Sequence, residues 1–319
     1  MNKNIYTVIS FFRLIRYPNL LFIALTQVLF YFKIVIPVSG GDPLLSMDDF
    51  FLLLMASISI AAAGYIINDY FDMDIDFINK PNRMIIGRSV SRRWAMLLHM
   101  LLSLIGLFLT AIVSMHLGSL WLLFMNFLSV FLLLLYSSTF KKKLIIGNVI
   151  ISLLTAWVII SLFVSAFKWD DLQYLNAKQA VFSKLYRYTI AYAAFAFVVS
   201  LIREVVKDAE DQIGDKQYGC TTMPIKWGQA GTKIFLFVLI FVLTASLLSI
   251  LVGQSLSIVF FDFSNYKTWL QNFLLIILLV QLSVMVQKLR RASVPIDYSV
   301  ISRELKLFML TGILTMLSL

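Results

Sequence analysis

Residues 49–76 read DFFLLLMASISIAAAGYIINDYFDMDID, an apolar run that ends in a cluster of aspartates. A helix that crosses a membrane needs about 20 consecutive and mostly apolar residues. Residues 49–68 meet that requirement, with Asp49 as their only charged residue. We therefore predict a membrane-spanning helix over 49–68 whose last turn leads directly into acidic side chains.

The rest of the chain has the same apolar character. Hydrophobic residues make up 60% of the 319 positions, charged residues only 14%, and the mean hydropathy is +0.88, whereas soluble domains average about 25% charged residues. Candidate spans cover about 18–38, 49–68, 94–115, 117–136, 144–167, 188–203, 234–253, 269–287 and 305–319. The predicted fold class is all-α, a polytopic membrane bundle of about nine transmembrane helices. The sixth segment is short and ends in charged residues, and a break near Gly118 separates the third from the fourth.

The net charge of +10 follows the topology of this bundle. With nine spans and a cytoplasmic N-terminus, 21 of the 27 basic residues fall in cytoplasmic segments, as the positive-inside rule requires. We expect a multi-pass protein of the cell (inner) membrane, formed by one domain over residues 1–319 with cytoplasmic cap loops at about 69–93 and 204–233. A nucleic-acid partner is not expected, because the basic residues lie in short loops between apolar segments.

Several kinds of site lack the residues that they need. Cys220 is the only cysteine, which excludes an intrachain disulfide and a cysteine-based metal site. The two histidines, His99 and His116, are expected to pack inside the bundle or at a membrane interface. Zinc and haem are therefore not expected, and the G-x-x-x-x-G-K loop of many nucleotide-binding proteins is also missing.

Two acidic clusters share one spacing. The first follows the second predicted span and the second follows the sixth, and at a constant offset of 139 residues both read D-x-x-D-x-x-x-D. The matching residues are Asp69, Asp72 and Asp76 in the first cluster and Asp208, Asp211 and Asp215 in the second. Residues three and four apart share one face of a helix, so each cluster predicts an acidic helix face. Asn68 joins the first face and Glu204 the second, whereas Asp74 and Glu210 lie off these faces.

Such faces are costly unless cations neutralise them. Each carboxylate drawn into the membrane costs at least about 2.5 kcal/mol, and like charges four residues apart destabilise a helix further. Mg²⁺ prefers oxygen ligands and commonly binds through one or two carboxylates together with substrate phosphates. We therefore predict Mg²⁺, as two ions, that bridges the two faces to a polyphosphate. The predicted ligands are Asn68, Asp69, Asp72, Asp76, Asp208, Asp211 and Asp215.

Two other interpretations stay open at this point. In the first, the clusters are ordinary helix ends exposed to water. In the second, they form the cation or proton relay of a non-catalytic membrane transporter. A relay places isolated acids deep inside spans, whereas these acids follow the ends of the predicted spans. Their position favours the polyphosphate site.

The motifs around the clusters resemble those of the UbiA superfamily of intramembrane prenyltransferases. The first cluster continues into Ile78-Asn79-Lys80-Pro81-Asn82-Arg83, and the second into Gly214-Asp215 and Thr221-Thr222-Met223-Pro224. The similarity extends over most of the chain through three shorter stretches, Arg16-Tyr17-Pro18-Asn19, Tyr136 to Lys141 and Gly147-Asn148. Within the superfamily, the second motif looks most like that of the digeranylgeranylglyceryl phosphate synthase branch, which transfers a geranylgeranyl group to geranylgeranylglyceryl phosphate.

The resemblance implies a prenyltransferase that takes its prenyl group from an isoprenyl diphosphate, with Mg²⁺ stabilising the leaving diphosphate. It implies that Asp72, Asp76, Asp211 and Asp215 are the catalytic aspartates. Among the basic and polar residues near the motifs, the expected diphosphate contacts are Arg83, Arg88, Lys141 and Lys207, and the expected acceptor contacts are Arg203 and Asn19. Tyr65, Tyr70 and Tyr136 are candidates for stabilising a carbocation through their aromatic faces.

The sequence departs from the family pattern in one loop. The family usually has a proline-rich turn after the position of Arg83, whereas Met84-Ile85-Ile86-Gly87-Arg88 contains no proline. An aromatic quinone precursor therefore stays open as an alternative acceptor. The resemblance favours geranylgeranyl diphosphate as donor and a lipid acceptor in the membrane.

Overall fold

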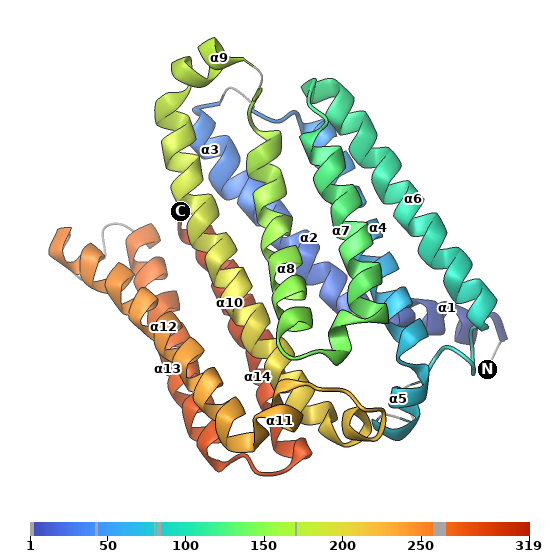
Figure 1. The fold of residues 1–319 in the computed structure, drawn as a ribbon. Helices are drawn as coiled ribbons and strands as arrows, with labels where there is room; N and C mark the ends of the chain where they lie inside the picture. Colours follow the sequence, from blue (N-terminus) through green and yellow to red (C-terminus); the bar gives the residue numbers. More distant parts are fainter. Residues whose placement is uncertain (1–2, 42–43, 80, 82–83, 170, 258–265) are drawn as a thin grey trace.

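The structure, a computed structural model, describes residues 3–41, 44–79, 81, 84–169, 171–257 and 266–319, and it is all-helical (Figure 1). Its long helices form a bundle. The helices longer than seven residues are α1 (Lys3–Leu14), α2 (Tyr17–Phe30), α4 (Met47–Phe71), α6 (Arg92–Leu117), α7 (Trp121–Ser138), α8 (Ile146–Ser165), α10 (Gln179–Gln217), α12 (Gly228–Ser257), α13 (Tyr266–Arg291) and α14 (Pro295–Leu314). Shorter helices are η1 (Tyr31–Val35), α3 (Ile36–Ser39), α5 (Met73–Asn79), η3 (Phe140–Lys142), α9 (Leu172–Ala177), α11 (Met223–Lys226) and η4 (Thr315–Ser318).

The predicted polytopic helical fold is confirmed. Within the described residues, eight helical stretches are long and apolar enough to cross a membrane, and the first runs through α2, η1 and α3. The ninth predicted segment is also helical, but α14 begins earlier, at Pro295, and its residues 297–306 include Asp297, Arg303, Glu304 and Lys306. It packs against α10 and α13, so a charged helix completes the bundle.

The sixth predicted span, 188–203, lies within a longer helix that begins at Gln179. The apolar count ends at residue 203, but α10 continues without interruption to Gln217 and is 39 residues long. Charged side chains end a hydrophobic run without ending a helix, because Glu, Lys and Gln are good helix formers. The second acidic cluster therefore lies on the same helix as the span. By contrast, the predicted break near Gly118 is confirmed, since Gly118 caps α6 with a φ of 67°.

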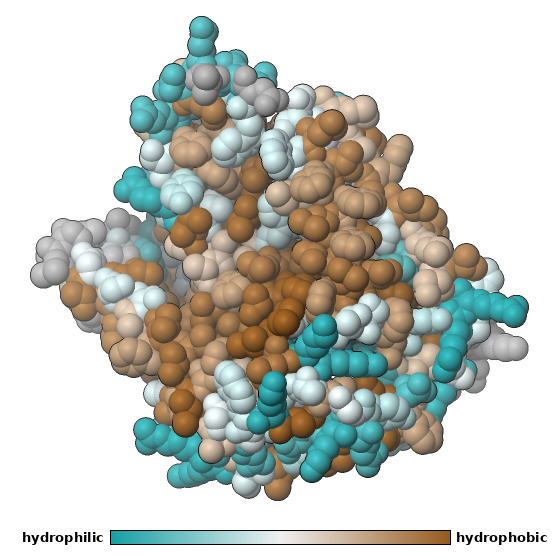
Figure 2. All heavy atoms as spheres, in the orientation of Figure 1, coloured by the Kyte–Doolittle hydropathy of each residue, from teal (hydrophilic) through white to brown (hydrophobic). Residues whose placement is uncertain are grey.

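The surface of the bundle has the polarity that a membrane requires. Large apolar side chains are exposed along several of the long helices, among them Leu104 and Phe108 on α6 and Phe241 on α12. In Figure 2 the brown surface occupies the middle of the molecule and hydrophilic residues gather at both ends. At the end remote from the aspartates, His116 Nδ1 lies 2.7 Å from Asp49 Oδ1 and joins α6 to the start of α4.

Candidate active site

A cavity of about 230 Å³ opens between α2, α4, α7, α8, α10 and α14. Its deeper wall is mostly apolar and includes Phe22, Leu154 and Met316. Its polar end is formed where α2 begins and α10 approaches its C-terminus, with Arg16 and Arg203 in the lining. The shape suits a molecule with an apolar tail and a charged head.

The first acidic cluster lies at this polar end, where α4 is followed by α5. Asn68 and Asp72 are buried, and the Asn68 amide Nδ2 donates to Asp72 Oδ2 at 2.7 Å. The helical path continues across the junction, since the backbone N–H of Asp76 donates to the Asp72 carbonyl at 2.8 Å. Asp69 forms an ion pair with Arg16, with Asp69 Oδ1 at 2.5 Å from Arg16 Nη2. Asp74 is exposed, in line with its predicted position off the acidic face.

The second cluster lies on the last turns of α10. Asp208 accepts a hydrogen bond from Asn148 Nδ2 at 2.8 Å. Asp215 is buried, whereas Asp211 is half-buried. Glu204, one turn before Asp208, is buried, and its Oε1 lies 2.9 Å from Arg203 Nη1. Several carboxylates of this cluster are thus held at the cavity end by polar side chains from the bundle.

Lys141 lies between the two clusters. Its ammonium contacts Asp72 of the first cluster and interacts electrostatically with Asp76 and with Asp215 of the second. Burial alone would lower the pKa of Lys141, but the negative charges, led by Asp72, outweigh burial and hold this pKa well above its usual range. The lysine therefore remains charged and partly neutralises both clusters.

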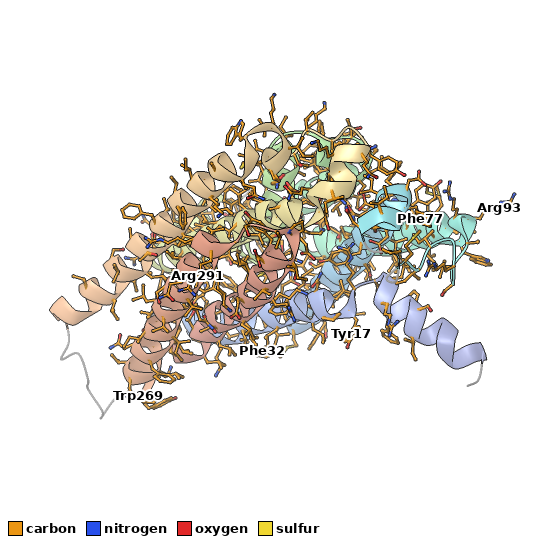
Figure 3. The ribbon with its side chains drawn as sticks, turned by 90° about the horizontal axis from the view of Figure 1, so that it is seen from below. Tyr17, Phe32, Phe77, Arg93, Trp269 and Arg291 are labelled. Atoms are coloured by element: carbon orange, nitrogen blue, oxygen red, sulfur yellow. The ribbon has the colours of Figure 1, made fainter. Side chains whose placement is uncertain are left out.

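Asn79, at the end of α5, connects the clusters through the backbone. Its Nδ2 donates to the Asp211 carbonyl at 2.9 Å, and its Oδ1 accepts from the Gly214 N–H at 2.8 Å. Figure 3 looks onto this end of the bundle, where α5 with Phe77 lies near the start of α6 with Arg93. The structure thus brings together two acidic motifs that are 139 residues apart in the chain.

The basic and polar candidates are distributed unevenly. Lys207, Arg203 and Asn19 line the cavity, whereas Arg88 is exposed in the turn before α6 and is not part of that lining. Arg83 lies outside the described residues.

The aromatic candidates divide in the same way. Tyr65 and Tyr136 line the cavity. Tyr70 does not, and it packs instead with the group of apolar residues around Ile66 and Ile86. Only two of the three tyrosines are therefore in a position to face a substrate in the cavity.

Three site residues belong to the sequence motifs, but the motifs alone did not predict which side chains they contact. They are Arg16, which pairs with Asp69, Asn79, which bridges the clusters, and Asn148, which holds Asp208. A fourth residue, Lys306, is one of the 21 basic residues that the predicted topology places on the cytoplasmic side, and it lines the cavity. An amide or guanidinium at the end of an apolar segment is a usable indication, since such a group needs a polar partner.

The donor set fits magnesium. The side-chain oxygen Oδ1 of Asn68 is buried and has no hydrogen-bond partner among the described residues, which leaves one amide oxygen available beside the Asp72 carboxylate. Among the described residues, no three His, Cys, Asp or Glu side chains converge closely enough to enclose an ion by themselves. Mg²⁺ usually completes its coordination with water and substrate phosphates, so this arrangement suits a metal bound together with a diphosphate.

Comparisons with known proteins give the family. The UbiA prenyltransferase family profile matches residues 28–294. The digeranylgeranylglyceryl phosphate synthase of Methanothermobacter thermautotrophicus is 33% identical over 210 residues, 63% of this chain and 66% of that protein. The enzyme of the same name from Pyrococcus horikoshii is 36% identical over 197 residues, 61% of this chain and 63% of that protein. Each match spans just under two thirds of these curated relatives.

Solved structures share the fold. One, from work on digeranylgeranylglyceryl phosphate synthase in membranes, has a TM-score of 0.61 at 23% identity and covers 98% of this chain and 100% of that one. A UbiA homologue from Archaeoglobus fulgidus, bound to GPP and Mg²⁺, has a TM-score of 0.57 at 16% identity, over 96% of this chain and 99% of that one. The expected family is confirmed by the profile match, and the chain belongs to the UbiA prenyltransferase family.

Proposed function

We propose that this protein transfers a geranylgeranyl group from geranylgeranyl diphosphate to geranylgeranylglyceryl phosphate, in a reaction that depends on Mg²⁺. The observation that carries the proposal is the meeting of two acidic clusters at the polar end of one apolar cavity. The names of the curated relatives support the choice of acceptor. The homologue bound to GPP and Mg²⁺ supports the choice of donor class and metal.

In this proposal the acidic clusters hold two Mg²⁺ ions. The ligands come from Asn68, Asp69, Asp72, Asp76, Asp208, Asp211 and Asp215, and Asp72, Asp76, Asp211 and Asp215 are the residues on which catalysis depends most. When bound, the metal neutralises the diphosphate and stabilises it as a leaving group. Lys141 and Lys207 supply further positive charge next to the clusters, and Arg83 and Arg88 are further proposed diphosphate contacts.

The cavity residues act on the rest of the donor. When the allylic C–O bond breaks, the electron pair leaves with the diphosphate and a delocalised carbocation remains on the prenyl chain. The apolar wall excludes water that would capture this cation, and Tyr65 and Tyr136, which line the cavity, are the aromatic side chains that would stabilise it. The acceptor hydroxyl, positioned by Arg203 and Asn19, then bonds to the allylic carbon and loses its proton.

Purified protein with geranylgeranyl diphosphate tests this function, with geranylgeranylglyceryl phosphate or an aromatic acid as acceptor, each with MgCl₂ or with EDTA. We expect product from the lipid acceptor only, and only with Mg²⁺. Asp72→Asn and Asp211→Asn should each abolish transfer, whereas Asp74→Asn, whose side chain is 73% exposed, should retain it. If product forms only from the aromatic acid, the proposed lipid acceptor is wrong. A complete lack of prenyl transfer would leave the transporter interpretation.

We also propose that the aspartate end of the bundle faces the cytoplasm. The support is the distribution of basic residues, 21 of which fall on that side when the N-terminus is cytoplasmic. A water-soluble cysteine reagent that cannot cross the membrane tests this orientation. In cells it should label a cysteine introduced at Ser119, at the opposite end, and not one introduced at Ser89.

A further inference from the structure

The cavity-facing side of α14 changes from basic to apolar along its length. Lys306, Met309, Ile313 and Met316 all line the cavity, the last of them in the short helix η4 that follows α14. Their spacing of three, four and three residues places them on one face. The face therefore begins with an ammonium group and continues as a hydrocarbon surface.

The cavity-facing side of the neighbouring helix α10 changes in the opposite order, from apolar to basic along the chain. Phe195, Val199, Arg203 and Lys207 all line the cavity at intervals of four residues. The two helices pack directly against each other. Arg203 and Lys207 follow the apolar lining residues of α10, whereas Lys306 precedes those of α14. Antiparallel packing of the two helices therefore brings these basic residues toward the same end of the cavity wall (Figure 1).

The charge of this wall is opposite to that of the aspartate clusters. The described lining contains four basic side chains, Arg16, Arg203, Lys207 and Lys306, and one acidic side chain, Glu204. The aspartates of the two clusters are not in that lining. Arg16 and Lys207 interact with aspartates of the clusters, whereas Lys306 reaches the cavity from α14, which carries neither cluster. The polar end thus has acidic clusters that attract cations and, on the α14 side, a basic side chain that attracts an anion.

We propose that Lys306 binds the phosphate of the lipid acceptor, while the acceptor's hydrocarbon chain lies along Met309, Ile313 and Met316. This inference rests on the proposed function and deepens it. The donor diphosphate is drawn to the metal at the aspartates of α4, α5 and α10. Lys306 approaches from α14, which packs on α10, α13 and α2. The second anionic head therefore belongs to the acceptor, and Lys306 makes the enzyme select a phosphorylated amphiphile.

Steady-state kinetics of the full-length enzyme with Mg²⁺ and geranylgeranyl diphosphate test this role. The acceptors are geranylgeranylglyceryl phosphate and geranylgeranylglycerol, which lacks the phosphate. Lys306→Gln should raise the KM for the phosphorylated acceptor by about tenfold or more, since it removes a charge-assisted contact. The KM for the donor and the kcat should change less than about twofold. The preference for the phosphorylated acceptor should fall by the same factor as its KM rises.

Two variants serve as controls. Lys306→Arg keeps the charge and should keep the KM near the wild-type value, and it tests the role even if Lys306→Gln impairs folding. Lys288→Gln removes a lysine of α13 whose Nζ is paired with Glu304 Oε1 at 2.6 Å and which lies outside the cavity lining. It should leave both KM values unchanged.

The outcomes separate this inference from the function on which it rests. If the wild type prenylates the phosphorylated acceptor and Lys306→Gln does so with an unchanged KM, the role of Lys306 is refuted and the proposed function stands. An equal rise in the KM for the donor also refutes it, because Lys306 then acts on the diphosphate. If the wild type makes no product from the phosphorylated acceptor, the proposed function itself fails.

Discussion

The side-chain carbonyl of Asn79 accepts a hydrogen bond from the backbone N–H of Gly214 at 2.8 Å. The approach is so close that a Cβ atom at position 214 would lie 2.7 Å from the Asn79 side chain. Only glycine at this position leaves room for the amide that connects the two acidic clusters. The distance between the clusters thus depends on one residue in each motif.

Gly214→Ala should therefore separate the clusters and reduce prenyl transfer at least about tenfold, because a displacement of about 1 Å in a catalytic arrangement commonly has a large effect. Transfer assays with MgCl₂ measure the loss. Asn79→Ala should cause a similar loss by removing the bridge itself. The double variant should be no less active than Asn79→Ala alone, because alanine at position 79 leaves no side chain for the methyl group at position 214 to collide with. Additive losses would show that Gly214 matters for another reason.

Lys141 should stabilise the metal-free protein. Its side chain is 20% exposed and that of its partner Asp72 only 5%, and removing one member of a buried ion pair typically costs about 3–5 kcal/mol. Lys141→Met should lower the thermal unfolding temperature strongly in EDTA and much less with MgCl₂, because a bound cation replaces the lost charge. Lys142→Met, which removes an exposed neighbour, should have little effect in either condition. An equal loss with and without Mg²⁺ would contradict this account.

The contribution of Lys141 should also be independent of pH in the usual range. Its pKa is raised, so the folded protein gains stability that is fully present below the ordinary lysine value and lost only above it. Between about pH 6 and 9, the difference in unfolding temperature between wild type and Lys141→Met in EDTA should therefore not fall because of this lysine. Thermal unfolding at several pH values measures it.

Cys220 should be an unreactive thiol in the folded protein. Burial, followed by the nearby charge of Asp215, raises the pKa of Cys220 to about 11. The thiolate is the reactive form, so alkylation by iodoacetamide in EDTA should be slow near neutral pH and rise about tenfold per unit between about pH 8 and 10. Mass spectrometry of the intact protein measures the rate. In protein unfolded by a denaturing detergent, the alkylation rate should follow the ordinary thiol pKa near 8.5. If the alkylation rate of the folded protein stops rising by pH 9, the prediction is wrong.

Close packing of α10 against α14 should make Gly312 sensitive to substitution. A Cβ at position 312 would collide with the ring of Phe195, which also lines the cavity. Gly312→Ala should lower stability by about 1–3 kcal/mol, the usual cost of overpacking, as measured by thermal unfolding. Gly253→Ala, in α12, has no atom of the described residues within 4 Å of the added methyl and should be neutral or slightly stabilising. Equal behaviour of the two variants would exclude overpacking at Gly312.

Much of the architecture was predictable because its causes are local in the sequence. Apolar runs of spanning length located the helices, and the D-x-x-D-x-x-x-D spacing indicated acidic helix faces. The length of α10 was not predictable from hydropathy, because its turns beyond residue 203 carry many charged side chains and hydropathy detects only apolar segments. The ion pairs and hydrogen bonds between helices were not predictable either. Arg16 and Asp69 are 53 residues apart, and Asn148 and Asp208 are 60 apart.

Lys306 illustrates the same limit. In the sequence it is one of many basic residues near the end of an apolar segment, and the positive-inside rule accounts for it fully. Only the packing of α14 against α10 places it on the cavity wall. A sequence reports which residues are charged, whereas the packing of distant helices decides which charges face each other.

The length of α10 has a consequence for how a lipid reaches this enzyme. Its 39 residues extend roughly 58 Å, and the hydrocarbon layer of a bilayer is only about 30 Å thick. The helix is therefore longer than this layer is thick, and its aspartates lie on its last turns, at one end of it. A lipid that enters by lateral diffusion can keep its polar head in hydrated surroundings and its tail in hydrocarbon throughout the reaction. In the proposed reaction, neither the lipid acceptor nor its product would then need to cross or leave the leaflet in which it resides.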